Sequence, residues 1–121
     1  MDNNFEGLKV WQKAHMLTLD IYKVTAEYPP NEMYGLIFQL RRSASSIPAN
    51  IVEGYSRGTT KQYINFLHIA NGSLSETRYF IILSKDLGYL SDDQFSKLEN
   101  ECKEIGKILQ AIVRTLNKRE K

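Results

Sequence analysis

The sequence predicts an all-α protein, an antiparallel up-and-down bundle of four helices. Apolar residues recur every three or four positions along four long segments, which is the spacing of one helix face. Short connections with proline, glycine or capping residues separate these segments, and short connections favour antiparallel neighbours. With 121 residues, 42% of them hydrophobic, the chain has the size of one compact domain, so residues 1–121 are expected to form a single unit.

The first helix is expected near residues 7–28. Its apolar stripe consists of Leu8, Trp11, Ala14, Leu17, Ile21 and Val24. The sequence Tyr-Pro-Pro-Asn at 28–31 ends it, because adjacent prolines cannot continue the backbone hydrogen-bond ladder. Asn31 is a suitable residue to cap the next helix.

The second helix is expected near residues 32–55, with a proline in its interior. Leu36, Leu40, Ser43, Ile47 and Ile51 form its stripe. Pro48 removes a backbone donor at a cost of about 3 kcal/mol. One interpretation is a bend at which serine hydroxyls from Ser43, Ser45 and Ser46 satisfy the freed carbonyl. The alternative is that Ser46 caps a new short helix with Pro48 in its first turn.

The third and fourth helices are expected near residues 60–87 and 92–117. Gly88 is suited to the left-handed turn that closes the third helix. Ser91 and Gln94 have the spacing of a capping box that opens the fourth. We expect one core that includes Leu17, Ile21, Leu40, Ile47, Ile51, Leu67, Ala70, Leu74, Cys102, Ile105, Leu109 and Ile112.

A turn near residue 58 sets the expected register between the second and third helices. It places Ala44 opposite Ser73, Ile47 opposite Ala70, and Arg41 near Glu76. The second helix also carries a polar row made of Gln39, Arg42, Ser46, Asn50, Glu53 and Arg57. The row is either a solvated face with an Arg–Glu pair across helices or an interface with another subunit.

The sequence contains no pattern that indicates catalysis or a bound cofactor. His15 and His68 have no metal-ligand spacing, and Cys102 lies on an apolar stripe as a buried thiol. Asp92 and Asp93 favour the dipole of the fourth helix and need no catalytic role. No glycine-rich phosphate loop is present. We therefore expect no enzyme activity, no cofactor, no metal and no small-molecule substrate.

The charge pattern suits a partner with phosphate groups, although a short basic terminus is more often only solvated. The net charge is +2, yet residues 114–121 hold four basic side chains and one acidic one. The candidate phosphate contacts are Arg57, Lys61, Arg114, Lys118 and Arg119. The first residues lack the features of a signal peptide, and no apolar run approaches the ~18 residues of a membrane span. A cytoplasmic protein with no membrane partner is expected.

Four segments carry a resemblance to a known family. They are FEGLKVWQKA (5–14), YGLIFQLRRSASSIPANIVEG (34–54), FLHIANGSLSE (66–76) and KDLGYLSDDQF (85–95). Together they resemble the four-helix bundle proteins encoded in intervening sequences of bacterial 23S ribosomal RNA genes. The matching motif positions are Arg41, Arg42, Ser46, Pro48, Asn50, Glu53, Gly54, Ser73 and Glu76. Thr77 and Arg78 depart from the pattern, where a further acidic residue is more usual.

The resemblance implies a fold and a class of function. The family is similar in fold to the accessory protein of diversity-generating retroelements, which is implicated in binding nucleic acid and a reverse transcriptase. The resemblance also implies that the protein forms a ring-shaped homopentamer. Two hypotheses follow: a non-enzymatic oligomeric accessory protein that binds RNA or DNA non-specifically, or a protein–protein interaction scaffold with no nucleic-acid ligand. The salt dependence of binding separates these hypotheses, because the affinity for a phosphate backbone falls steeply as the salt concentration rises, whereas the affinity of an apolar protein interface does not.

Overall fold

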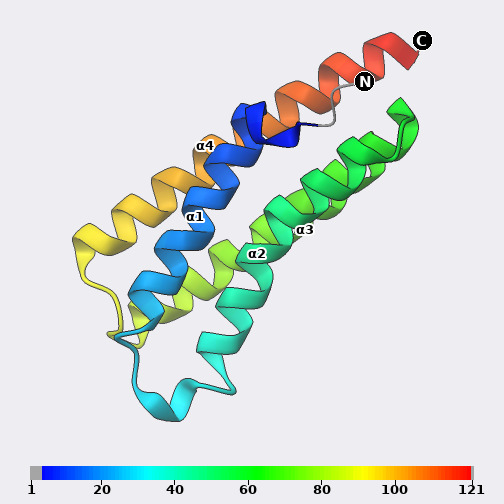
Figure 1. Cartoon of the computed structure of the whole chain (residues 1–121). Coiled ribbons are helices and arrows are strands. Elements are labelled where there is room, and N and C mark those ends of the chain that lie inside the picture. The colour runs from blue at the N-terminus through cyan, green and yellow to red at the C-terminus, as the bar shows by residue number, and fades with distance from the viewer. Residues whose placement is uncertain (1–3, 121) are drawn as a thin grey trace.

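The protein is a bundle of four α-helices, seen here in a computed structural model that describes residues 4–120 (Figure 1). The helices are α1 (Lys9–Thr25), α2 (Leu36–Ser56), α3 (Thr60–Asp86) and α4 (Asp92–Glu120). Two 3-10 turns, η1 (Phe5–Gly7) and η2 (Pro30–Glu32), precede α1 and α2. Residues 4–120 contain no strand, so the all-α prediction is confirmed.

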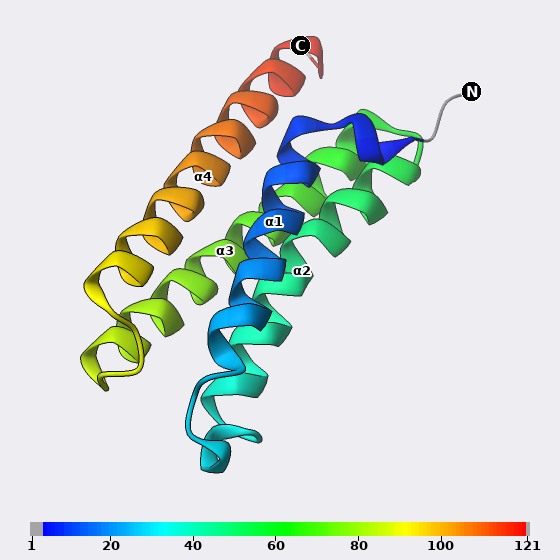
Figure 2. The same cartoon turned by 60° about the vertical axis from the view of Figure 1, so that its left-hand side comes forward.

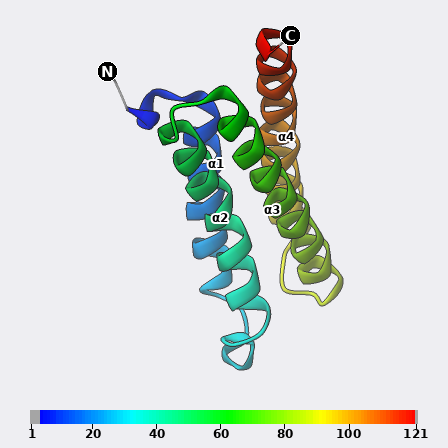
Figure 3. The same cartoon turned by 90° about the vertical axis from the view of Figure 1, so that its right-hand side faces the viewer.

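Successive helices run in opposite directions. Figures 2 and 3 show the first turn of α1, the α2–α3 turn and the last turns of α4 at one end of the bundle. The α1–α2 and α3–α4 connections lie at the other end. α2 and α3 share the most extensive contact of any helix pair.

The connection between α1 and α2 differs from the sequence prediction. α2 begins at Leu36 rather than at residue 32. Asn31 lies within η2 and does not cap α2. Instead a Glu32 carboxylate oxygen accepts from the Leu36 amide at 3.2 Å, and its other oxygen accepts from the Tyr89 hydroxyl at 2.9 Å. A Cβ at Gly35 would lie 2.8 Å from the capping oxygen, so glycine leaves room for this carboxylate.

Pro48 lies inside an uninterrupted helix. α2 is helical from Leu36 to Ser56, so the alternative in which a new helix starts at Ser46 is wrong. The Ala44 carbonyl, which Pro48 deprives of its helical donor, accepts from the Thr18 hydroxyl of α1 at 3.1 Å, and this hydroxyl also lies 2.9 Å from the Ala14 carbonyl, so the two acceptors share one proton. This carbonyl is therefore satisfied from another helix, whereas the Ser45 hydroxyl donates one turn earlier, to Arg41, at 2.7 Å. The bend at Pro48 stays a prediction.

Small and hydroxyl-bearing residues let α2 and α3 approach closely. We call this contact the α2–α3 seam; its central residues are Ser43, Ser46, Gly54, Ser73 and Thr77. Ser46 and Ser73 share a 2.8 Å hydrogen bond, and the Thr77 hydroxyl donates to Ser43 at 2.9 Å. Ser46 rather than Ala44 thus pairs with Ser73, so the predicted register is displaced by about half a turn.

The helix ends at the α3–α4 connection agree with the sequence prediction, whereas α1 ends at Thr25, three residues before the predicted end at 28. Gly88 has φ +84° and closes α3, with the Tyr89 amide donating to the Ser84 carbonyl. The capping box is present, because the Ser91 amide donates to Gln94 at 2.9 Å and the Gln94 amide to Ser91 at 3.1 Å.

One hydrophobic core draws on all four helices. Every predicted core residue is buried except Ile112, which is half-buried near the end of the bundle where α4 projects. Cys102 is fully buried, and burial raises the pKa of its thiol to about 12. Within the described part of the chain, no helix has both the length and the apolar character needed to cross a membrane.

Candidate nucleic-acid interface

Charge is distributed unevenly along the bundle axis. We call the end that holds the α2–α3 turn the basic end; it comprises residues 4–16, 47–72 and 106–119. It carries eight basic and two acidic side chains, whereas described residues 17–46 and 73–105 carry seven basic and ten acidic ones. The basic residues are Lys9, Lys13, Arg57, Lys61, Lys107, Arg114, Lys118 and Arg119; the acidic ones are Glu6 and Glu53. A polyanion is therefore attracted to this end.

A groove runs between α3 and α4 within the basic end. Its volume is about 400 Å³, and it is lined by Leu67, His68, Asn71, Leu109, Gln110, Val113, Arg114 and Asn117. A neighbouring hollow on α3, also about 400 Å³, is lined by Lys61, Gln62, Ile64, Asn65 and His68. His68 borders both hollows, so we treat them together as the α3/α4 groove. Most of the residues that line it are polar, and apolar side chains such as Leu67, Leu109 and Val113 lie among them.

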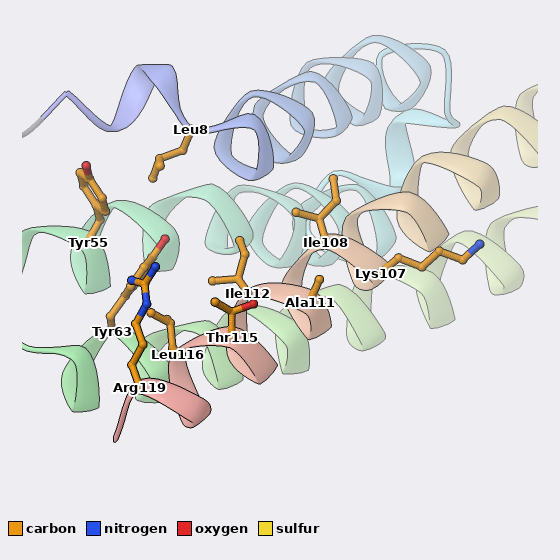
Figure 4. A pocket seen from close by; sticks show the side chains of 10 residues that line it. All are labelled: Leu8, Tyr55, Tyr63, Lys107, Ile108, Ala111, Ile112, Thr115, Leu116 and Arg119. Carbon is orange, nitrogen blue, oxygen red and sulfur yellow. The ribbon is translucent and has the colours of Figure 1, made fainter. Parts of the chain in front are cut away.

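A second groove opens where the first turn of α1 meets α4. It has a volume of about 550 Å³ and mostly apolar walls that include Leu8, Ile108, Ile112 and Leu116 (Figure 4). Figure 4 shows Tyr55, Tyr63 and Arg119 gathered at one end of it, with Lys107 at the other. The two tyrosine rings meet edge to face at 5.8 Å, and burial raises the pKa of Tyr63.

The five predicted phosphate contacts all lie at the basic end, but their surroundings differ. Lys61 and Arg114 border the α3/α4 groove, and Arg119 lines the groove of Figure 4. Lys118 is exposed on the last turns of α4. Arg57 has partners within the chain: its Nε lies 2.8 Å from a Glu53 carboxylate oxygen, and its guanidinium lies 5.0 Å from the Phe66 ring.

The polar row of α2 is bonded within the chain. Arg42 bonds both Gln39 and Glu76, the latter at 2.6 Å. The Asn50 amide donates to the Ser46 carbonyl at 2.8 Å. Together with the Ser46–Ser73 and Arg57–Glu53 contacts, every member of the row has a partner. The expected Arg–Glu pair across helices is therefore present, while the contribution of the row to a subunit interface stays a prediction.

The prediction that Arg41 lies near Glu76 is wrong. Arg41 turns toward α1, where its Nε donates to the Thr25 hydroxyl at 2.9 Å and its guanidinium lies 4.5 Å from the Tyr22 ring. Arg42 takes the place beside Glu76 because the register differs from the predicted one. Two other motif positions, Pro48 and Gly54, are buried in helix packing.

The two positions that depart from the family pattern both have structural partners. Thr77 is fully buried in the α2–α3 seam. Arg78 reaches across to α4 and donates to Glu99 at 2.9 Å, a contact that raises the pKa of its guanidinium. These residues therefore connect α3 to both of its neighbours.

Among the described residues, no group of three or more His, Cys, Asp or Glu side chains is placed to hold a metal ion. The His15 ring stacks on Trp11 with centroids 4.8 Å apart.

The sequence analysis missed the amide side chains of the α3/α4 groove. They are Gln62, Asn65, Asn71, Gln110 and Asn117. A signal was available: residues 60–75 and 105–119 contain no Asp or Glu at all. Two such stretches on neighbouring helices indicate a surface without negative charge.

Comparison with known proteins identifies relatives. Residues 6–111 match the family described as 23S rRNA-intervening sequence protein. A solved structure of a protein of unknown function from the S23 ribosomal protein family, from Bacteroides thetaiotaomicron, superposes with a TM-score of 0.77. The two chains are 29% identical, and the match covers 86% of this chain and 97% of that one. No curated protein matches the chain.

Proposed function

The chain belongs to the family of 23S rRNA-intervening sequence proteins, and we propose that it is a non-enzymatic accessory protein that forms a ring of identical copies and binds RNA or DNA without sequence specificity. The observation that carries this proposal is the basic end, with eight basic and two acidic described side chains. Phosphate contacts from Lys and Arg supply sequence-independent affinity for nucleic acid.

A ring explains how such a small basic surface becomes useful. One copy offers few phosphate contacts, and each alone contributes little affinity. Several copies held together make these contacts simultaneously, so the second and later contacts form at high effective concentration. The working surface is then the assembled ring rather than the single bundle.

Exposed apolar side chains support self-association. Met16, Leu19 and Tyr22 are exposed on α1, Phe38 on α2, Met33 and Tyr34 in the connection between them, and Ile69, Tyr79 and Ile82 on α3; each residue is at least 40% exposed. Exposed apolar side chains that lie next to one another often mark an interaction site. Contact between two different faces of identical chains is heterologous, and heterologous contacts close into rings when the rotation permits.

The test is the molar mass of the protein in solution, with and without RNA, combined with a salt titration of binding. We expect a closed oligomer and an affinity that falls steeply as salt rises. Arg57→Glu with Lys61→Glu should weaken binding at low salt and leave helicity intact. The matched control is Lys23→Glu with Lys103→Glu, which makes the same charge change on exposed residues outside the basic end.

Two results contradict the proposal. A protein that stays monomeric at high concentration contradicts the ring. An absence of salt-sensitive affinity for RNA or DNA contradicts nucleic-acid binding. If the protein oligomerises but binds neither RNA nor DNA, a protein–protein interaction scaffold becomes the better account.

A further inference from the structure

We propose that the α3/α4 groove is a binding site for single-stranded nucleic acid. This inference rests on the proposed function and deepens it, because it names the form of nucleic acid and the side chains that contact it. Lys61 and Arg114 contact phosphates, and His68, Asn71 and Gln110 contact bases.

The first argument is the absence of carboxylates. Residues 60–75 of α3 and 105–119 of α4 contain no Asp or Glu, and these stretches form both walls of the groove. A phosphate that enters it meets no fixed negative charge from either wall. Elsewhere on the bundle, basic side chains such as Arg42, Arg57 and Arg78 are held by Glu76, Glu53 and Glu99. Lys61 and Arg114 have no such ion pair within the described residues.

The second argument is the set of side-chain amides that lack partners. Asn65, Asn71, Gln110 and Asn117 line the groove, and among residues 4–119 none of their side chains makes a hydrogen bond within the protein. The amide of Asn50, in the α2–α3 seam, is bonded twice to Ser46. An amide presents both a donor and an acceptor, which suits the edges of unpaired bases.

The third argument is the shape and chemistry of the groove. Leu67 and Leu109 are buried beneath it, and Val113 is half-buried, so the floor is apolar. Its volume of about 400 Å³ lies in the range of small-ligand sites, ~300–1,000 Å³. It therefore has room for a splayed nucleotide. The exposed His68 ring borders both hollows and is placed to stack on a base.

The mixture of groups favours a single strand over a duplex. In a duplex the Watson–Crick edges of the bases are already paired and the base faces are stacked, so the phosphates, the sugars and the groove edges of the bases remain. A single strand offers phosphates, base edges and base faces together, and it can use the basic, amide and histidine side chains at once. Neither RNA nor DNA is preferred by these contacts, because no side chain is assigned to a 2′-hydroxyl.

The experiment measures the affinity of the full chain for a labelled oligouridine, for an oligothymidine, and for an RNA duplex of the same length. Wild-type protein should bind both single strands at least about tenfold more tightly than the duplex. Asn71→Asp with Gln110→Glu places two carboxylates in the groove and should lower single-strand affinity at least about tenfold. The control, Asn31→Asp with Asn100→Asp, makes the same chemical change at exposed positions outside the basic end and should lower it less than about twofold.

A second variant removes the amides without a change in net charge. Gln110→Ala with Asn117→Ala alters two exposed side chains, so the fold should be preserved. We expect the preference for single strand over duplex to shrink, with duplex affinity unchanged. This separates amide recognition from general electrostatics.

The possible outcomes distinguish the two proposals. If wild-type protein binds duplex and single strand equally, or if the groove and control variants lose affinity equally, the groove inference is wrong while nucleic-acid binding by the basic end stands. If wild-type protein binds none of the three probes, the proposed function and the groove inference both fail.

Discussion

α3 contacts its two neighbours in opposite ways. On one side, in the α2–α3 seam, polar side chains pair with one another: Ser46 with Ser73, and Thr77 with Ser43. On the other side, in the α3/α4 groove, the side-chain amides of Asn65, Asn71, Gln110 and Asn117 lack partners within the described residues. Gln62 is the exception, because its amide oxygen accepts from the Thr59 hydroxyl at 2.9 Å, and the basic side chains of Lys61 and Arg114 lack ion pairs. Both surfaces contain polar residues at helical spacing.

The difference teaches that spacing alone does not separate a structural polar residue from a ligand-binding one. What separates them is the distance to the next helix. In the seam, glycine and serine let the backbones approach, so every hydroxyl finds a partner. In the groove, the helices leave a hollow of about 400 Å³, and the polar groups face solvent. Functional residues are therefore better sought among unpartnered polar groups than among polar rows.

The largest expected effect tests whether the groove floor belongs to the core. Leu109 is buried beneath the groove, so Leu109→Ala should lower the free energy of unfolding by about 2–5 kcal/mol. Gln110 is the adjacent exposed wall residue, and Gln110→Ala should change it by less than about 0.5 kcal/mol. Denaturant unfolding measures both. An unchanged midpoint for Leu109→Ala contradicts the assignment of floor and wall.

The second prediction tests the close approach of the seam. A Cβ at Gly54 would lie 2.6 Å from the Phe66 Cβ, which cannot move without its backbone. Gly54→Ala should therefore destabilise the protein by about 1–3 kcal/mol. Gly72 lies on the exposed face of the partner helix, with nothing within 4 Å of a built Cβ. Gly72→Ala should stabilise by up to about 1 kcal/mol, because alanine favours a helix.

Thermal unfolding measures the change in stability that each glycine substitution causes. Equal changes for Gly54→Ala and Gly72→Ala would show that α2 and α3 are not closely packed at Gly54. Opposite signs would support the view that closeness, rather than helix propensity, makes Gly54 necessary.

The third prediction concerns the proline inside α2. Thr18→Val removes the hydroxyl that donates to the Ala44 carbonyl and leaves this buried acceptor unsatisfied, at about 1–3 kcal/mol. Pro48→Ala restores the amide that can bond the same carbonyl. In that background Thr18→Val should cost much less. A double-mutant cycle of unfolding free energies measures the coupling, and additive costs would rule out this role of Thr18.

The sequence predicted well what depends on local chemistry. Residue type and helical spacing were enough to predict the capping box of Ser91 and Gln94, the turn at Gly88 and all but one of the core residues. What failed depends on how helices meet. The start of α2 is set by Glu32 through space, and the partner of the Ala44 carbonyl comes from a different helix. A displacement of about half a turn between α2 and α3 was enough to exchange Arg41 for Arg42 beside Glu76.

The same limit applies to the candidate site. The candidate basic residues could be identified from their charge alone. Their charge did not reveal that Arg57 forms an ion pair with Glu53 and lies over the Phe66 ring. The acid-free stretches were visible in the sequence, and only the packing of α3 against α4 shows that they face one groove. Site prediction therefore needed the helix register, which periodicity does not supply.

The pair Glu101 and Asp20 is a half-buried exception to the pairing seen in the seam. These carboxyl groups of α4 and α1 lie within hydrogen-bonding reach, and one Glu101 oxygen is buried without another partner. Burial, the hydrogen bond to Asp20 and the charge of Asp20 raise the pKa of Glu101 from 4.5 to about 8, against the opposing charges of Lys97 and Lys13. At neutral pH the folded protein therefore holds a proton here that the unfolded chain has released.

The smallest expected effect follows from this proton. Between about pH 4.5 and 8 the folded state binds more protons at Glu101, so stability should fall as pH rises through this window. Because the pair is partly exposed and screened by water, the loss should be on the order of 1 kcal/mol. Glu101→Gln keeps a neutral donor beside Asp20 and should remove most of the pH dependence. Glu104→Gln, on the exposed side of the same helix, should retain it. Thermal unfolding at a series of pH values measures this, and wild-type stability that rises through the window would show that the two carboxyls do not share a proton.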